Sequence, residues 1–236
     1  MILDDIVSAK QRSLNSSGRF VDVIQDSPGI ELICELKLKS PTHSQPFVDD
    51  YNSVLRDYKS AGVKLMSVVT DGPYFGGELG MVTQARSEGF LVLRKDFIIE
   101  PSQIAEVYAD ALLLIARILE PSKLKELVAI CQSVNIEPVV EIHSEDELNS
   151  AQESGARVIA VNTRDLDKQE ISFNKGLALL AKINDSHIKL LFSGINSNHQ
   201  VKQAQQAGAD AVLVGTSVLT AGDRIAKIAE IRGSHE

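Results

Sequence analysis

Charged side chains stand at the ends of two short apolar runs in this sequence. The run ELICEL at 31–36 contains Glu35 and is followed by Lys37, and the run FLVLR at 90–94 is followed by Lys95. A lysine ammonium can deliver a proton to a developing alkoxide, and a carboxylate can remove a proton from carbon. These residue types therefore indicate general acid and base chemistry, provided that the fold brings the two runs together.

Two further runs carry polar groups in the same place. The run EPVVEI contains Glu141, and the run RVIAV is followed by Asn162. Side chains alternate between the two faces of a strand, so Glu35 and Lys37 lie on one face. For the same reason Lys95, Glu141 and Asn162 each lie on the same face as the apolar residue two positions earlier. Each group alone has a bland explanation as a structural ion pair or a solvated strand end. Their convergence on one rim favours an active site.

Small residues follow two later runs. IKLLF is followed by Ser193 and Gly194, and DAVLV is followed by Gly215 and Thr216. Backbone N–H groups and hydroxyls in such loops can hold a phosphate, and in barrels of alternating strands and helices the loops after strands seven and eight often do so. Glycine and serine are also common in ordinary turns, so one such loop alone is weak evidence. Two of them at the ends of consecutive predicted strands predict a phosphate site.

Short apolar runs recur along the chain with amphipathic segments between them. Their nearly continuous apolar character is typical of parallel strands buried on both faces, and the runs cover 31–36, 64–69, 90–94, 111–116, 137–142, 157–161, 188–192 and 210–214. Intervening segments close at Gly62, Gly155 and Gly208, as helices commonly do. The pattern predicts a (β/α)8 TIM barrel, an α/β fold. A doubly wound open sheet is the alternative, weakened because no G-x-G-x-x-G follows the first run.

We expect one domain, with a short N-terminal helical extension over 1–30 and the barrel over 31–236. The 236 residues carry a formal net charge of −8, which argues against nucleic-acid and membrane surfaces. Without a signal peptide or a long apolar segment, the expected location is the cytoplasm. Cys34 and Cys131 do not suggest a disulfide framework, and no histidine spacing predicts a metal site. The absence of G-x-S-x-G or paired Cys and His argues against acyl transfer.

The residues resemble the indole-3-glycerol-phosphate synthase family of tryptophan biosynthesis. The matching segments run in order from residue 31 and include ELKLKSP at 35–41, LRKDFIIEPSQI at 93–104, EPVVEIHSEDEL at 137–148, IAVNTRDL at 159–166 and GADAVLVGTSVL at 208–219. The resemblance implies a lyase that closes the ring of 1-(2-carboxyphenylamino)-1-deoxyribulose 5-phosphate with loss of CO₂ and water. It implies a small phosphorylated substrate, no cofactor and no metal. Oligomeric state is left open, with a monomer as the default.

The resemblance also implies a role for individual residues. Lys95 would be the general acid, and Lys37 would pair with the substrate carboxylate or phosphate and share in acid catalysis. Glu141 would be base or acid in the dehydration, and Glu35 would position the lysines and take part in proton transfer. Asn162 would hydrogen-bond a hydroxyl of the ribulose chain, and Arg164 would lie beside the site. The remaining implied contacts are Ser40, Ser193, Gly194, Gly215 and Thr216 at the phosphate, and Phe75 or Phe97 along the aromatic part, where burial in the core is the alternative.

One residue departs from the family pattern in the catalytic region. The family carries a glutamate immediately before Ser-Gly, and this chain carries Phe192 there, in phase with the inward residues of its run. A phenylalanine ring accepts no strong hydrogen bond, so one lysine loses a counter-charge. The loop after Ser40 and the segment at 103–115 also diverge. Three hypotheses follow: a working synthase with an altered pocket, a paralogue that binds a related phosphorylated ligand with lost or changed chemistry, and a Schiff-base lysine aldolase or isomerase.

Overall fold

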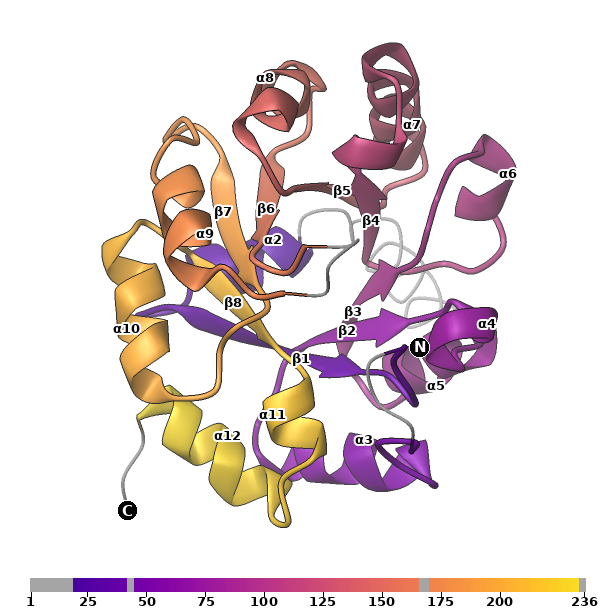
Figure 1. The fold of residues 1–236 in the computed structure, drawn as a ribbon. Coiled ribbons are helices and arrows are strands. Elements are labelled where there is room, and N and C mark those ends of the chain that lie inside the picture. The colour runs from indigo at the N-terminus through magenta and orange to yellow at the C-terminus, as the bar shows by residue number, and fades with distance from the viewer. Residues whose placement is uncertain (1–18, 42–44, 166–169, 234–236) are drawn as a thin grey trace, which may run out of the picture.

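The computed structural model describes residues 19–41, 45–165 and 170–233. Its centre is a closed barrel in which eight parallel strands pair in chain order and β8 returns to pair with β1 (Figure 1). The strands are β1 (Glu31–Leu36), β2 (Leu65–Val69), β3 (Leu91–Lys95), β4 (Ala111–Ile115), β5 (Glu137–Ile142), β6 (Val158–Asn162), β7 (Ile188–Phe192) and β8 (Ala211–Val214). The predicted barrel is confirmed, and the open sheet is excluded.

Helices surround this barrel, as Figure 1 shows. They are α2 (Arg19–Gln25), α3 (Tyr51–Ser60), α4 (Gly72–Phe75), α5 (Leu79–Ser87), α6 (Pro101–Ile104), the 3₁₀ turn η1 (Ala116–Ile118), α7 (Pro121–Ser133), α8 (Glu145–Glu153), α9 (Phe173–Leu180), α10 (Asn198–Gln206), α11 (Thr216–Leu219) and α12 (Arg224–Arg232). Gly62, Gly155 and Gly208 have φ values of 67°, 88° and 93° just past the ends of α3, α8 and α10. This left-handed conformation favours glycine and explains the predicted helix stops.

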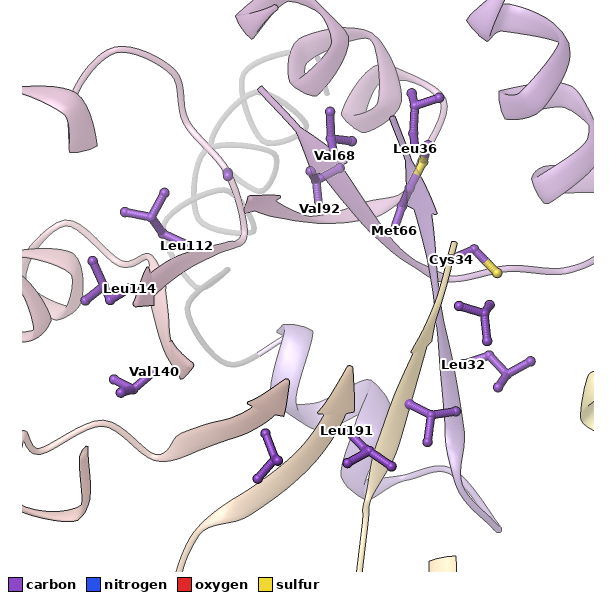
Figure 2. Close-up of a cluster of buried hydrophobic side chains, with 14 of the residues drawn as sticks. Leu32, Cys34, Leu36, Met66, Val68, Val92, Leu112, Leu114, Val140 and Leu191 are labelled. Atoms are coloured by element: carbon purple, nitrogen blue, oxygen red, sulfur yellow. The ribbon is translucent and has the colours of Figure 1, made fainter. Parts of the chain in front are cut away.

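Two apolar cores lie on opposite faces of the barrel wall. Outward side chains such as Leu32, Cys34 and Leu36 pack against the surrounding helices, and Figure 2 shows this outer layer. Inward side chains such as Ile33 and Leu65 fill the barrel itself. Successive strand residues alternate between the two cores, so both sets must be apolar and each run is nearly continuous.

The helix α2 covers the amino-terminal end of the barrel. Phe20, Val21 and Ile24 are buried in the inner core with residues that begin several strands, including Leu65 and Leu91. This confirms a helix at 19–25 within the expected extension, whereas the helix expected at 4–14 lies outside the described residues. Helix α2 thus packs at the amino-terminal end of the barrel, opposite the strand ends at which the sites of such barrels lie. In the described part of the chain, no helix has the length and apolar character to cross a membrane.

Candidate active site

A cavity of about 550 Å³ opens at the carboxyl ends of the strands. Its wall comes from the ends of β1, β2, β3, β6, β7 and β8 and from the loops that follow them. The lining residues are Glu35, Lys37, Ser40, Val69, Phe75, Lys95, Asn162, Arg164, Ile171, Phe192, Ser193, Gly194, Ile195, Asn196, Leu213, Gly215, Thr216 and Ser217. Segments far apart in sequence thus meet around one space, as the predicted convergence of strand ends requires.

Glu35 is the centre of a cluster with both predicted lysines. Its Oε1 accepts a hydrogen bond from Lys37 Nζ at 2.8 Å, and its Oε2 lies 3.9 Å from Lys95 Nζ. Burial by itself would raise the pKa of Glu35, but the two ammonium groups outweigh it and lower that pKa below its ordinary value. Glu35 is therefore an anion that two cations share. Lys95 keeps 24% of its side chain exposed, which leaves its ammonium accessible from the cavity.

Gly215 makes room for this carboxylate. A Cβ atom at Gly215 would lie 2.6 Å from Glu35 Oε1, so a larger residue would push the glutamate out of its place. The next residue, Thr216, accepts a hydrogen bond from Lys37 Nζ at 3.1 Å. The β8 loop therefore fixes the lysine pair as well as forming part of the predicted phosphate site.

The two predicted phosphate loops lie side by side. Ser193 and Gly194 both have positive φ values, 68° and 77°, which turn the backbone sharply after β7. The hydroxyl of Ser217 donates to the carbonyl of Ile195 at 3.0 Å and ties the β8 loop to the β7 loop. Consecutive backbone N–H groups in turns of this kind form concave sites for anions.

Glu141 is buried next to the cavity residue Asn162. Only 1% of the residue is exposed, and Asn162, which does line the cavity, donates from Nδ2 to Glu141 Oε1 at 3.2 Å. The other amide atom, Asn162 Oδ1, accepts from the backbone N–H of Arg164 at 3.1 Å. Asn162 thus links the glutamate to the loop that carries Arg164.

The floor of the cavity is apolar. Phe192 is 1% exposed and pairs in register with Asn162 on one side and Leu213 on the other. Phe75 lines the wall, but Phe97 lies outside the cavity, with 37% of the residue exposed and its ring centroid 6.5 Å from that of Phe75. Phe97 therefore packs against a cavity residue without lining the cavity itself, and its place along the aromatic part of a substrate stays a prediction.

Arg94 anchors the end of β3 from the outer face. Its guanidinium donates to Asp96 Oδ2 at 2.9 Å, to Glu106 Oε2 at 2.8 Å and to the carbonyl of Gln103 at 2.6 Å, and only 1% of its side chain is exposed. Arg94 thus holds the turn that directly follows Lys95.

The sequence model of the indole-3-glycerol phosphate synthase family matches residues 3–231. The chain belongs to this family. An indole-3-glycerol phosphate synthase of Leuconostoc mesenteroides is 32% identical, with 99% of both chains covered. Indole-3-glycerol phosphate synthase 2 of Streptomyces coelicolor is 38% identical over 202 residues, which cover 83% of this chain and 78% of that protein.

Solved structures of other proteins share the fold of this family member. A 3-hexulose-6-phosphate synthase from Salmonella typhimurium superposes with a TM-score of 0.68 at 16% identity and covers 86% of this chain and 97% of that one. Thiamine phosphate pyrophosphorylase from Pyrococcus furiosus gives a TM-score of 0.61 at 13% identity, with 86% and 94% covered. At these identities the likeness concerns the barrel alone.

Sequence reasoning missed several cavity residues of this synthase family member. Ile171 lines the wall and forms an antiparallel bridge with Arg164, which follows β6. The inward direction of Leu213 could have been predicted from strand alternation, since the residue lies on the same face as the inward Ala211. His143 does not line the cavity but lies against Glu141, and its place two residues later in VVEIH was the available signal. Among the described residues, no group of three or more His, Cys, Asp or Glu side chains could hold a metal ion.

Proposed function

We propose that this protein is an indole-3-glycerol-phosphate synthase acting on 1-(2-carboxyphenylamino)-1-deoxyribulose 5-phosphate. The observation that carries the proposal is the cluster of Lys37, Lys95 and Glu35 in a cavity that also contains the Ser193 and Gly215 loops. Membership of the family supports the same activity. A phosphate at one end of the substrate and a carboxylate at the other call for basic groups at both ends of the cavity.

The apolar floor fits the middle of this substrate. We place the phosphate at the loops of Ser193, Gly194, Gly215 and Thr216, together with Ser40, because these residues line one cavity and Ser217 ties the two loops to each other. The anilino ring then lies over the apolar part of the wall, which includes Phe192 and Phe75. Asn162 and Arg164 serve the hydroxyls of the ribulose chain between the two ends.

In the first step a carbon–carbon bond forms between the ring carbon that bears the carboxylate and the substrate carbonyl carbon. Lys95 gives a proton to the carbonyl oxygen, which becomes a hydroxyl. The carboxylate then leaves as CO₂, and its bonding electrons restore the aromatic ring. Lys95 suits this role because its accessible ammonium is held near the Glu35 anion without being buried.

In the second step the new hydroxyl leaves as water and the indole forms. Lys37 supplies the proton to the leaving hydroxyl, and Glu141 removes a proton from the adjacent methylene carbon. With an ionised carboxylate, the whole reaction takes up one proton: two are given to oxygen and one is taken from carbon. Burial of Glu141 excludes water from the base, which strengthens its interaction with the substrate.

Phe192 favours a second candidate, a paralogue that binds a related phosphorylated ligand with altered chemistry. The ring occupies the floor next to Asn162, where it gives the lysines no counter-charge. Such a protein would keep the phosphate loops and lose turnover.

One experiment separates the two candidates. Purified protein is incubated with 1-(2-carboxyphenylamino)-1-deoxyribulose 5-phosphate, and indole fluorescence is followed with time. A synthase gives a catalytic rise in fluorescence, and Lys95→Met removes it. Binding of the substrate without any product, even at high enzyme concentration, identifies the paralogue. Borohydride treatment during the incubation tests for a Schiff base, since the synthase route forms no covalent adduct with lysine.

The protein is further proposed to act as a monomer in the cytoplasm. The described cavity is built from one barrel, and both cysteines are buried free thiols, as suits a reducing compartment. Burial raises the pKa of the Cys34 thiol to about 12, which keeps it protonated and unreactive. Analytical ultracentrifugation of the active enzyme tests whether it is a monomer. A dimer at assay concentrations would overturn this part of the proposal.

A further inference from the structure

The ring of His143 lies between two carboxylates. His143 follows β5 directly, and 6% of its side chain is exposed. Its Nε2 is 3.3 Å from Glu141 Oε1, and its Nδ1 is 3.6 Å from Glu147 Oε2. Neither ring nitrogen forms a well-aligned hydrogen bond within the described residues. A buried titratable group thus contacts the proposed base, and the reaction steps above give it no task.

Glu141 is held unevenly by its neighbours. Its Oε1 is approached from two sides, by Nδ2 of Asn162 at 3.2 Å and by Nε2 of His143 at 3.3 Å. Its Oε2 is buried and has no hydrogen-bond partner in the part of the chain that is described. One hydrogen bond and one close ring contact on Oε1 orient the carboxylate, and the other oxygen remains available to take a proton.

Glu147 holds the opposite side of His143. Its Oε2 accepts the backbone N–H of His143 at 2.7 Å, and its Oε1 accepts the hydroxyl of Ser144 at 3.2 Å. Burial by itself would raise the pKa of Glu147, but the contacts with His143 outweigh it and lower that pKa below its ordinary value. An ionised Glu147 in the first turn of α8 therefore fixes both the backbone and the ring of His143.

Each ring nitrogen of His143 faces one carboxylate. The charged and polar groups around the ring are Glu141 on β5, Glu147 on α8 and the neutral Asn162 on β6, and Arg117 is the charged residue of η1, which packs against β5 and α8. With its Nδ1 side held at Glu147, the ring keeps Nε2 directed at Glu141.

We propose that His143 is a positioning residue, whose Nε2 holds Glu141 Oε1 beside Asn162 and so directs Oε2 toward the substrate. The proposal rests on the synthase activity proposed above. His143 itself is not among the residues that line the cavity. It acts through Glu141 alone.

Two isosteric substitutions separate the two sides of the ring. In His143→Gln the side-chain amide nitrogen can reach the place of Nε2 and still donate to Glu141. In His143→Asn the shorter amide can reach only the place of Nδ1, beside Glu147. We expect His143→Asn to lower kcat about 10-fold to 100-fold with KM nearly unchanged, since a small misplacement of a catalytic group has effects of this size. His143→Gln is expected to stay within about three-fold of the parent.

The difference between the two variants is a readout that a packing role would not give. Equal kcat for parent and His143→Asn, measured per folded molecule, would overturn the proposal. So would equal losses in the Gln and Asn variants.

A measurement without turnover keeps this inference separate from the proposed function. The ¹⁵N resonances of the His143 ring report the contact directly, and we expect Glu141→Gln to shift Nε2 and Glu147→Gln to shift Nδ1. An Nε2 resonance unmoved by Glu141→Gln would show that the contact is not made. Failure of the parent to form indole product would contradict the synthase assignment but leave these shifts unchanged.

Discussion

Two lysines in the cavity pair with the same carboxylate, that of Glu35. Lys37 makes a direct hydrogen bond to Glu35, and Lys95 makes a looser ion pair to the other oxygen of the same group. The residue on the floor, Phe192, adds no charge. An excess of positive charge suits a substrate with a phosphate and a carboxylate, since each substrate anion then gains a protein partner.

Replacing Lys95 tests the proposed acid. We expect Lys95→Met to lower kcat about 10²-fold to 10⁴-fold, the usual contribution of general acid catalysis. The folded structure is expected to remain, because Glu35 keeps Lys37 as its partner. Steady-state kinetics and thermal unfolding measure both effects. Lys64→Met, at an exposed position before β2, is the matched control and should behave as the parent. Normal turnover by Lys95→Met would refute the assignment.

Replacing Phe192 tests whether the missing carboxylate limits the rate. We expect Phe192→Glu to raise kcat, because it returns a counter-charge to the lysines, and to lower the melting temperature, because the buried ring loses its apolar contacts. Phe192→Gln has nearly the same shape without the charge and should show only the loss of stability. If the Glu and Gln variants turn over equally slowly, the cavity has adapted to the ring and charge is not limiting.

At the scale of an element, β3 joins a catalytic face to a structural one. Lys95 ends the strand and points into the barrel. Its neighbour Arg94 points outward, where it is buried and donates hydrogen bonds to Thr70 and Asp96. Strand alternation alone places adjacent cations in such different surroundings. The outer network holds the turn that orients the inner lysine.

Arg94→Met tests this network. Removal of the buried cation leaves Asp96 without its partner, and we expect the free energy of unfolding to fall by about 3 kcal/mol, at the lower end for broken buried pairs because Glu106 is partly exposed. Urea denaturation measures the change. Arg56→Met makes the same substitution in the exposed pair with Asp50 and should leave the urea midpoint unchanged. Similar effects of both variants would mean that burial does not decide the contribution of Arg94.

At the scale of the whole molecule, the helix that closes the barrel and the cavity of the candidate active site lie at opposite ends. Helix α2 closes the amino-terminal end with Phe20, Val21 and Ile24, whereas the cavity lies at the carboxyl ends of the strands. This separation is common to barrels of this kind, since the loops that carry the chemistry all emerge at one end.

Phe20→Ala tests the separation. The ring is fully buried, so its removal should lower the free energy of unfolding by about 3–5 kcal/mol. Turnover per folded molecule should stay at the parental value, because α2 lies at the end of the barrel away from the cavity. Urea denaturation and kinetics at low temperature measure the two effects. A loss of kcat in the folded variant would show that the two ends are coupled.

The sequence by itself determined the barrel and most of the rim. Nearly continuous apolar runs specify parallel strands buried on both faces, and strand phase then places Lys37, Lys95 and Asn162 at one end. Only the tertiary structure decided which of these groups contact one another. Both lysines pair with Glu35, and Glu141 contacts Asn162 and His143. Phe97 lies outside the cavity for a related reason, since residues beyond a strand end no longer follow its alternation. Alternation fixes which face a side chain takes, whereas distances across the barrel depend on register, turns and packing that no single run encodes.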